Sequence, residues 1–211
     1  IFGDILSIGV QSLITELSSG IVVLAFNIII LGLAGNTGVA AYAVIANTSI
    51  VAVSIFTGIA QGGQPLISAA HGIGDKDRLR AVLRYSIISQ LVIALMVYLA
   101  IAFFTTPIAA IFNSEHIDSL QRMAEDGMKI YFTGLFFSGF NIIISAFFAA
   151  SEKIIPAQTI TILRGFALIV PMAFIMSKAA GLTGVCLAYP VTEFIVAAIS
   201  IIFYISNRHK T

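Results

Sequence analysis

The chain has 211 residues, of which 59% are hydrophobic and 10% are charged, and its mean hydropathy is +1.04. Since a soluble domain is about 45–50% apolar and about 25% charged, this composition excludes an ordinary soluble protein and predicts a surface that faces lipid. The net charge of +1, without a basic patch interleaved with aromatic residues, leaves no reason to expect nucleic acid as a partner.

A helix that crosses a bilayer needs about 20 mostly apolar residues. Six stretches meet this requirement, and they predict one all-α transmembrane domain over residues 1–211, a polytopic six-helix bundle. We expect short turns at Gly35–Gly38, Ser151–Lys153 and Ala179–Gly181, a charged loop from His71 to Arg80, and the longest link at 105–127. The predicted spans cover about 5–33, 38–67, 81–104, 128–150, 155–177 and 184–206.

Basic residues predict the orientation of this bundle, because short cytoplasmic loops carry an excess of lysine and arginine. Seven basic residues fall at one predicted end and three at the other, so both ends of the chain are expected on the cytoplasmic side of the cell (inner or plasma) membrane. The seven are Lys76, Arg78, Arg80, Arg84, Lys153, Arg208 and Lys210, and the three are Arg122, Lys129 and Lys178.

Cysteine and histidine give no sign of a metal site. The single cysteine, Cys186, excludes an internal disulfide and a thiolate metal cluster. The three histidines fall in predicted loops or the C-terminal tail, without the spacing of metal ligands, so no metal and no cofactor is expected. Because the chain opens at Ile1 without a charged leader, we expect a piece of a longer protein rather than a signal peptide.

Three charged residues, Glu16, Arg164 and Glu193, fall near the middle of predicted spans. A charge at this depth is costly unless it faces a cavity or a partner, so each is a candidate functional residue. Arg164 and Glu193 are also candidates to neutralise one another across the fifth and sixth spans. For Glu16 the alternative is a buried side chain that only holds helices together by hydrogen bonds.

Polar residues form stripes on three of the predicted helices, at the 100° per residue of an α-helix. Such a stripe on an apolar helix predicts a surface that lines a cavity, although small and amide residues also pack membrane helices together. For the fourth span both interpretations stay open. The stripes are Ser12, Glu16, Ser19, Gly20 and Asn27; Asn47, Ser54, Gly58, Gln61, Pro65 and Ser68; and Gly134, Ser138, Asn141 and Ser145.

Several segments, in order along nearly the whole chain, resemble the MATE (multidrug and toxic-compound extrusion) family. The most specific is Gln61-Gly62-Gly63-Gln64-Pro65. The others are Ser12–Gly20 with its acidic residue, Val39–Tyr42, Leu163-Arg164, and Gly184–Pro190.

The resemblance implies a secondary transporter rather than an enzyme. Such proteins have twelve helices in two six-helix lobes, and this chain would be the C-terminal lobe, with the N-terminal lobe preceding Ile1. The expected activity is antiport, in which H⁺ or Na⁺ drives export of amphipathic or cationic drugs by alternating access. Expected partners are the lipid bilayer, the N-terminal lobe and small-molecule organic cations.

The resemblance also implies roles for individual residues. Glu16 is the first candidate for ion coupling, with Asn27 and Asn141 beside it. Asn141 stands where family members with a cation site in this lobe carry an aspartate, and Gln11 stands where many carry a proline. Candidates to line the cavity are Ser12, Ser19, Tyr42, Asn47, Gln61, Gln64, Ser138, Arg164 and Glu193.

Two other functions remain possible from the sequence. A lipid-linked oligosaccharide flippase of the same superfamily would need a more basic cavity. A non-transporting membrane assembly subunit would lack the second lobe. An intramembrane aspartyl protease is disfavoured, because Asp75 in the string Gly72-Ile73-Gly74-Asp75 falls in a predicted loop and no predicted span contains an aspartate.

Overall fold

The computed structural model describes the backbone of residues 2–208 and the side chains of residues 20–207. Within this part the chain is helical, as the sequence predicts. The elements are α1 (Phe2–Gly72), α2 (Lys76–Phe112), α3 (Asp118–Tyr131), the 3₁₀ turn η1 (Phe132–Gly134), α4 (Leu135–Ala150), α5 (Ile154–Ile162), the π-helical turn η2 (Leu163–Ala167) and α6 (Ile169–Arg208).

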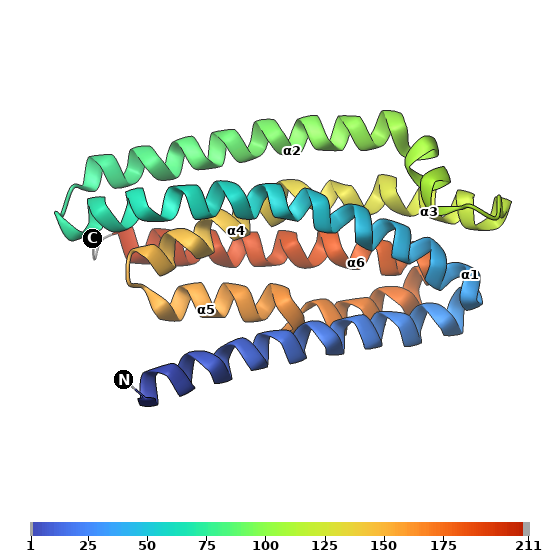
Figure 1. Cartoon of the computed structure of the whole chain (residues 1–211), viewed down its shortest axis with the longest axis horizontal. Helices are drawn as coiled ribbons and strands as arrows, with labels where there is room; N and C mark the ends of the chain where they lie inside the picture. Colours follow the sequence, from blue (N-terminus) through green and yellow to red (C-terminus); the bar gives the residue numbers. More distant parts are fainter. Residues whose placement is uncertain (1, 209–211) are drawn as a thin grey trace.

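Two of the helices are broken and double back on themselves (Figure 1). The break in α1 is at Gly35, with φ 61° and ψ −159°, and the break in α6 is at Ala180 and Gly181, where Gly181 has φ 56° and ψ −134°. Side chains with a Cβ are strained in this region of backbone space, whereas glycine adopts it freely. Both predicted turns therefore shrink to one or two residues.

Four described helical segments, residues 20–72, 76–112, 118–150 and 154–207, are long and apolar enough to cross a membrane. With the breaks in α1 and α6, the chain passes along the bundle axis six times. Five of the six predicted spans lie within these segments, and the first, 5–33, overlaps the first segment from residue 20 onward. Large apolar side chains cover the outside: Ile28 is 68% exposed, Phe103 79% and Ile202 64%. This surface suits a lipid environment.

The predicted loops are wrong in their extent. Only Ile73–Asp75 separates α1 from α2, because the Asp75 side chain accepts a hydrogen bond from the backbone N–H of Arg78 at 2.9 Å and begins a helix there. The predicted link at 105–127 is also mostly helical, since α2 continues to Phe112 and α3 begins at Asp118. Charged residues extend these helices beyond the apolar stretch instead of ending them.

A kink at Phe104 (φ −111°, ψ 22°) divides α2. Pro107 lacks a backbone N–H, and its ring clashes with the carbonyl four residues earlier, so the helix must open at this point. The hydroxyl of Thr105 donates to the carbonyls of Ile101 at 2.7 Å and Ala102 at 3.2 Å. The side chain thus satisfies backbone groups near the bend, as helices in hydrocarbon require.

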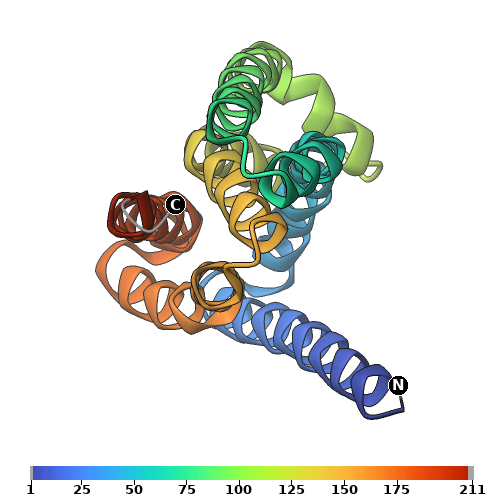
Figure 2. The ribbon, with the colours of Figure 1, turned by 90° about the vertical axis from the view of Figure 1, so that its left-hand side faces the viewer.

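The central helix is α4, which packs against α1, α2, α5 and α6. In the end-on view of Figure 2 it lies between α2 and the second half of α6. Its surroundings are apolar clusters that include Phe56 of α1, Phe132 of η1 and Phe148 of α4, all fully or almost fully buried. The first half of α1 runs along the edge of the bundle (Figure 2).

We predict that Gly181→Ala destabilises the protein, because alanine at φ 56° costs about 1–3 kcal/mol. Gly32→Ala is the matched control, since Gly32 is helical, exposed and without a neighbouring atom where a Cβ would lie. Thermal unfolding in detergent should give a lower midpoint for Gly181→Ala and an unchanged or higher one for Gly32→Ala. Equal midpoints for the two variants would refute a conformational requirement at the break.

Candidate functional site

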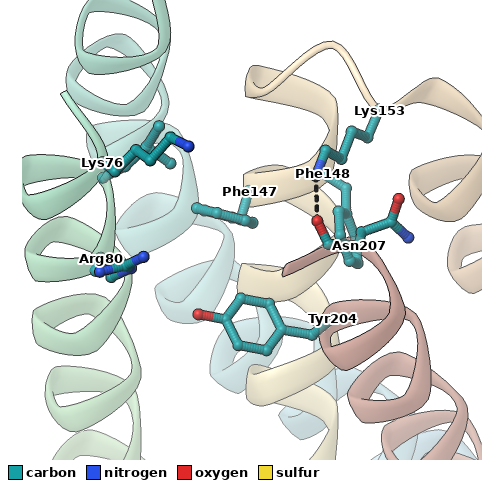
Figure 3. Close-up of a pocket in the computed structure, with 8 residues that line it drawn as sticks. Lys76, Arg80, Phe147, Phe148, Lys153, Tyr204 and Asn207 are labelled. Carbon is teal, nitrogen blue, oxygen red and sulfur yellow. Dashed lines mark hydrogen bonds between the residues drawn. The ribbon is translucent and has the colours of Figure 1, made fainter. Parts of the chain in front are cut away.

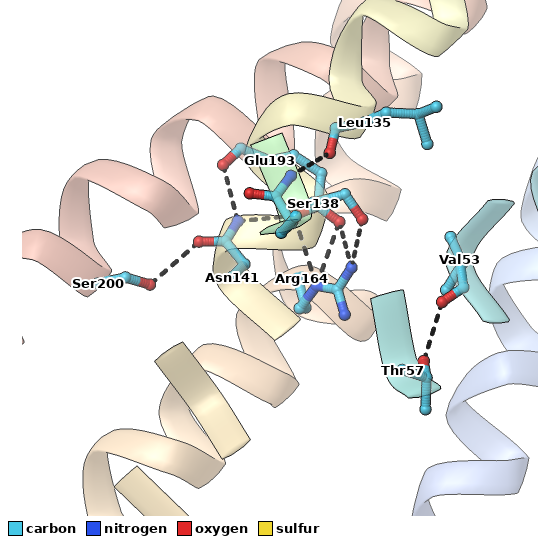
Figure 4. Close-up of polar contacts among 9 residues, drawn as sticks. Val53, Thr57, Leu135, Ser138, Asn141, Arg164, Glu193 and Ser200 are labelled. Atoms are coloured by element: carbon cyan, nitrogen blue, oxygen red, sulfur yellow. Dashed lines mark hydrogen bonds and ion pairs between the residues drawn. The ribbon is translucent and has the colours of Figure 1, made fainter. Parts of the chain in front are cut away.

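An ion pair between Arg164 of η2 and Glu193 of α6 lies at the centre of the bundle (Figure 4). Arg164 Nη2 donates to Glu193 Oε1 at 2.8 Å, and Nε donates to the same oxygen at 3.2 Å. The Glu193 side chain is 3% exposed and the Arg164 side chain 21%. The two residues therefore do pair across the fifth and sixth spans, a possibility that the sequence raised and left open.

The side chain of Asn141 in α4 holds the Glu193 carboxylate from its other side. Asn141 Nδ2 donates to Glu193 Oε2 at 2.7 Å and to the Glu193 backbone carbonyl at 2.9 Å. Its own Oδ1 accepts from the hydroxyl of Ser200 at 3.2 Å, and Arg164 Nη2 also donates to Ser138 Oγ at 2.8 Å. The result is a connected polar network (Arg164, Glu193, Asn141, Ser138 and Ser200) in which each member supports the next.

Four candidates from the sequence belong to this network, and all but Arg164 are removed from solvent. Ser138 and Asn141 are 0% exposed and Glu193 is 2% exposed. In this conformation they lie inside the protein, rather than on the wall of a cavity, and the hydrogen-bonding groups of Asn141 are engaged by Glu193 and Ser200. A direct role of Asn141 in ion coupling stays a prediction.

The π-helical turn η2 positions Arg164 for this contact. Its backbone N–H···O bond from Leu168 to Leu163, at 3.0 Å, spans five residues instead of four. The turn therefore accommodates one extra residue and rotates the next helix, α6, by about 100° relative to an uninterrupted α-helix. Sequence periodicity gives no signal for such a turn.

Gln90 of α2 is a buried polar residue that the sequence interpretation missed. It is 0% exposed, and its Nε2 donates to the carbonyl of Phe136 at 3.3 Å. Gly139 of α4 lies against it and leaves the space that its side chain fills. The sequence signal that could have identified Gln90 is a lone amide among apolar residues in the third predicted span.

Ser200 is a second residue that the sequence interpretation missed. It follows Glu193 by seven residues, or two helical turns, so helical periodicity places it on the same face of α6.

Arg164 also borders a groove between the second half of α1, α4 and α5. The groove has a volume of about 300 Å³, and its walls carry hydroxyl and amide groups together with apolar side chains. Two residues predicted to line a cavity, Gln61 and Gln64, are among its lining residues. The polar lining residues are Thr57, Gln61, Gln64, Ser145, Thr161 and Arg164.

A second groove, of about 280 Å³, lies between the two halves of α1. Asn27, Tyr42 and Asn47, all candidates from the sequence, line it. Asn27 and Asn47 are exposed, and the ring of Tyr42 stacks on Phe26 with centroids 5.3 Å apart. Ser12, Glu16 and Ser19 lie outside the described side chains.

A chain of aromatic rings connects this second groove to the centre. Tyr42 meets Tyr131 of α3 edge to face, with centroids 6.3 Å apart, and Tyr131 stacks on Tyr189 of α6 at 4.2 Å. Tyr189 lies one helical turn before Glu193 on α6. The groove between the halves of α1 and the buried network are therefore joined by packed tyrosine rings.

The described residues give no cluster of metal ligands. Among residues 20–207 no three His, Cys, Asp or Glu side chains gather in one place. The polar groups at the centre and in the grooves are amides, hydroxyls and one ion pair.

The chain is similar to known membrane proteins. The sequence model of the MatE family matches residues 12–175. Multidrug export protein MepA of Staphylococcus saprophyticus is 26% identical over 208 residues, which cover 97% of this chain and 45% of MepA. The chain thus spans about half the length of the curated relatives that it matches.

Solved structures share the fold. The inward-facing conformation of a multidrug resistance MATE family transporter of the MOP superfamily matches with a TM-score of 0.92 and 23% identity, over 100% of this chain and 49% of that one. The outward-facing conformation of such a transporter matches with a TM-score of 0.88 and 22% identity, over 99% and 47%.

We predict that Arg164→Gln destabilises the protein by about 3–5 kcal/mol, because it leaves the Glu193 carboxylate buried without its partner. Glu193→Gln should cost less, since Arg164 is partly exposed to a groove. Thermal unfolding and yield of folded protein in detergent measure both effects. The double variant Arg164→Gln/Glu193→Gln should recover most of the loss, and a double variant as unstable as the sum of the singles would refute the pairing.

Proposed function

Because this chain belongs to the MatE family, we propose that it is the C-terminal six-helix lobe of a secondary transporter that exports amphipathic, often cationic compounds in exchange for H⁺ or Na⁺. A relative that it matches is named a multidrug export protein, and the chain covers 45% of that protein. The proposed partner is an N-terminal lobe of the same protein, and the two lobes would enclose the transport cavity.

The observation that supports this proposal most is the exposure of polar side chains on an otherwise apolar helix. Asn27, Asn47 and Gln61 of α1 are exposed and line the two grooves. Amide groups that face hydrocarbon without a partner lose several kcal/mol of hydration. This face of α1 therefore suits water between two lobes better than lipid.

We place the coupling ion at Glu16, on the same helix. Eleven residues separate Glu16 from Asn27, which is three helical turns plus about 20° at 100° per residue. At this spacing an α-helix carries positions 16 and 27 on one face. In this proposal Glu16 is neutral when it holds the ion and charged when it has released it, and this change of charge biases which side of the membrane the cavity opens to.

The buried ion pair makes the groove beside it compatible with cations. Arg164 is the one cation among the residues that line the two grooves, and Glu193 neutralises it at 2.8 Å. An unpaired arginine would repel a cationic compound, whereas a neutralised one does not. A flippase for pyrophosphate-linked lipids would need net positive charge at this place, so the geometry favours the exporter.

We further propose that both ends of the chain lie in the cytoplasm. Lys76, Arg78, Arg80, Arg84 and Lys153 fall at the end of the bundle where α2 begins and α4 meets α5. Figure 1 shows that α1 begins and α6 ends at this end too. The excess of basic residues matches the charge bias of cytoplasmic loops.

We predict that Glu16→Gln reduces ion-driven export of ethidium by the intact protein at least about ten-fold, because a permanently neutral side chain cannot alternate between the two charge states. The measurement is efflux from proteoliposomes, under a proton gradient and separately under a sodium gradient. The gradient that drives the wild type identifies the coupling ion.

Glu152→Gln is the matched control, since Glu152 is an exposed carboxylate in the turn between α4 and α5. It should leave efflux unchanged. Efflux by Glu16→Gln at the wild-type rate under the driving gradient would remove Glu16 from the mechanism. Absence of ethidium efflux by the wild type under both gradients would argue against the exporter itself.

A further inference from the structure

A small cavity lies at the end of the bundle where α2 begins and α6 finishes (Figure 3). It is separate from the two grooves on α1 and from the buried network, and no feature of the proposed transport uses it. Side chains from α2, α4, the turn after α4, and α6 surround it. The lining residues are Lys76, Leu79, Arg80, Phe147, Phe148, Lys153, Tyr204 and Asn207.

The cavity lies between two helices, α2 and α6. α2 and α6 each pack against α4 but do not pack extensively against one another, and Figure 2 shows them on two sides of α4. Phe147 of α4 and Tyr204 of α6 meet edge to face beside the cavity, with ring centroids 6.1 Å apart. A ligand here would rest on aromatic rings and could enter from the surrounding lipid.

Positive charge gathers around this opening. Lys76, Arg80 and Lys153 line the cavity, and its described lining includes no carboxylate. The Lys153 ammonium donates to the carbonyl of Asn207 at 3.1 Å, which fixes its position beside the cavity (Figure 3). Arg80 also forms an ion pair with Asp77 at 3.5 Å, but with the Asp77 side chain 97% exposed this pair is weak.

The size of the cavity excludes a drug-like ligand. Its volume for water-sized molecules is about 40 Å³, whereas pockets for drug-sized ligands measure about 300–1,000 Å³. A single water needs about 10–15 Å³ by this kind of measure, so the space suits a group of a few heavy atoms. Cationic side chains around such a space recognise an oxyanion.

We propose that this cavity binds the phosphate group of an anionic phospholipid. Lys76 and Arg80 would contact the phosphate from α2 and Lys153 from the other side, while Tyr204 would offer its hydroxyl at the height of the head groups. Exposed apolar residues of the same helix, Ile202 and Ile205, are available to the acyl chains. Basic pockets between transmembrane helices are suited to anionic head groups, and the site does not depend on the proposed transport.

The test is native mass spectrometry of the intact protein, titrated with phosphatidylglycerol and, in parallel, with zwitterionic phosphatidylcholine. The pocket variant is Lys76→Gln/Arg80→Gln. The matched control is Arg78→Gln/Arg84→Gln, which removes the same charge from the same exposed stretch of α2 outside the cavity. Both variants change exposed side chains, and their thermal unfolding checks that they fold.

We expect wild type to prefer phosphatidylglycerol and the pocket variant to bind it about twenty-five-fold more weakly, at about five-fold for each of the two removed charges. The control variant should lose less than about three-fold. Equal losses in the two variants would overturn the site, because they would show a diffuse attraction of the whole basic end. No preference for phosphatidylglycerol in the wild type would overturn it as well.

A second arm distinguishes the lipid from a free anion. The protein in nanodiscs of phosphatidylcholine is titrated with inorganic phosphate, and its unfolding midpoint is followed. Phosphatidylglycerol in the disc should raise the midpoint of the wild type but not of the pocket variant, and inorganic phosphate should raise neither. Stabilisation by inorganic phosphate equal to that by the lipid would overturn the phospholipid assignment.

Discussion

The ion pair between Arg164 and Glu193 determines how the second half of this bundle is assembled. Charges within a bilayer must find a partner, because lipid offers none. Here one charge comes from η2 and the other from α6, and Asn141 of α4 completes the contact. Three segments of the chain must therefore meet at one point and in one register. The net stabilisation from such a pair can be small, but alternatives that separate the charges are very costly.

The polar residues of this chain fall into two groups with different surroundings. Those of α4 and α6 satisfy one another inside the protein, as Asn141, Glu193 and Ser200 do. Those of α1, such as Asn47 and Gln61, remain exposed in grooves. A closed network fixes a shape, whereas exposed amides beside apolar helices need water or a second lobe. This difference underlies the proposal that α1, rather than the centre of the bundle, faces the transport cavity.

Local departures from regular helix geometry shape both of these regions. Gly35 and Gly181 let long apolar helices reverse within one or two residues, so that α1 and α6 each cross the bundle twice. The π turn aims Arg164 at the core, and Pro107 bends α2 with Thr105 satisfying nearby carbonyls. Each of these departures occurs where a membrane protein has to turn or place a charge.

Short segments such as Gln61–Pro65 resemble the MATE family, and the family match confirms this resemblance. Hydropathy and the positions of glycines were enough to predict an all-α membrane bundle and its turns at Gly35 and Gly181. These features are local, since each depends on the length of an apolar run or on one backbone conformation. The sequence left open whether Arg164 pairs with Glu193, and it did not identify Gln90 as a buried polar residue. Such contacts join residues far apart in the chain, so only the packing of α2, α4, η2 and α6 could decide them.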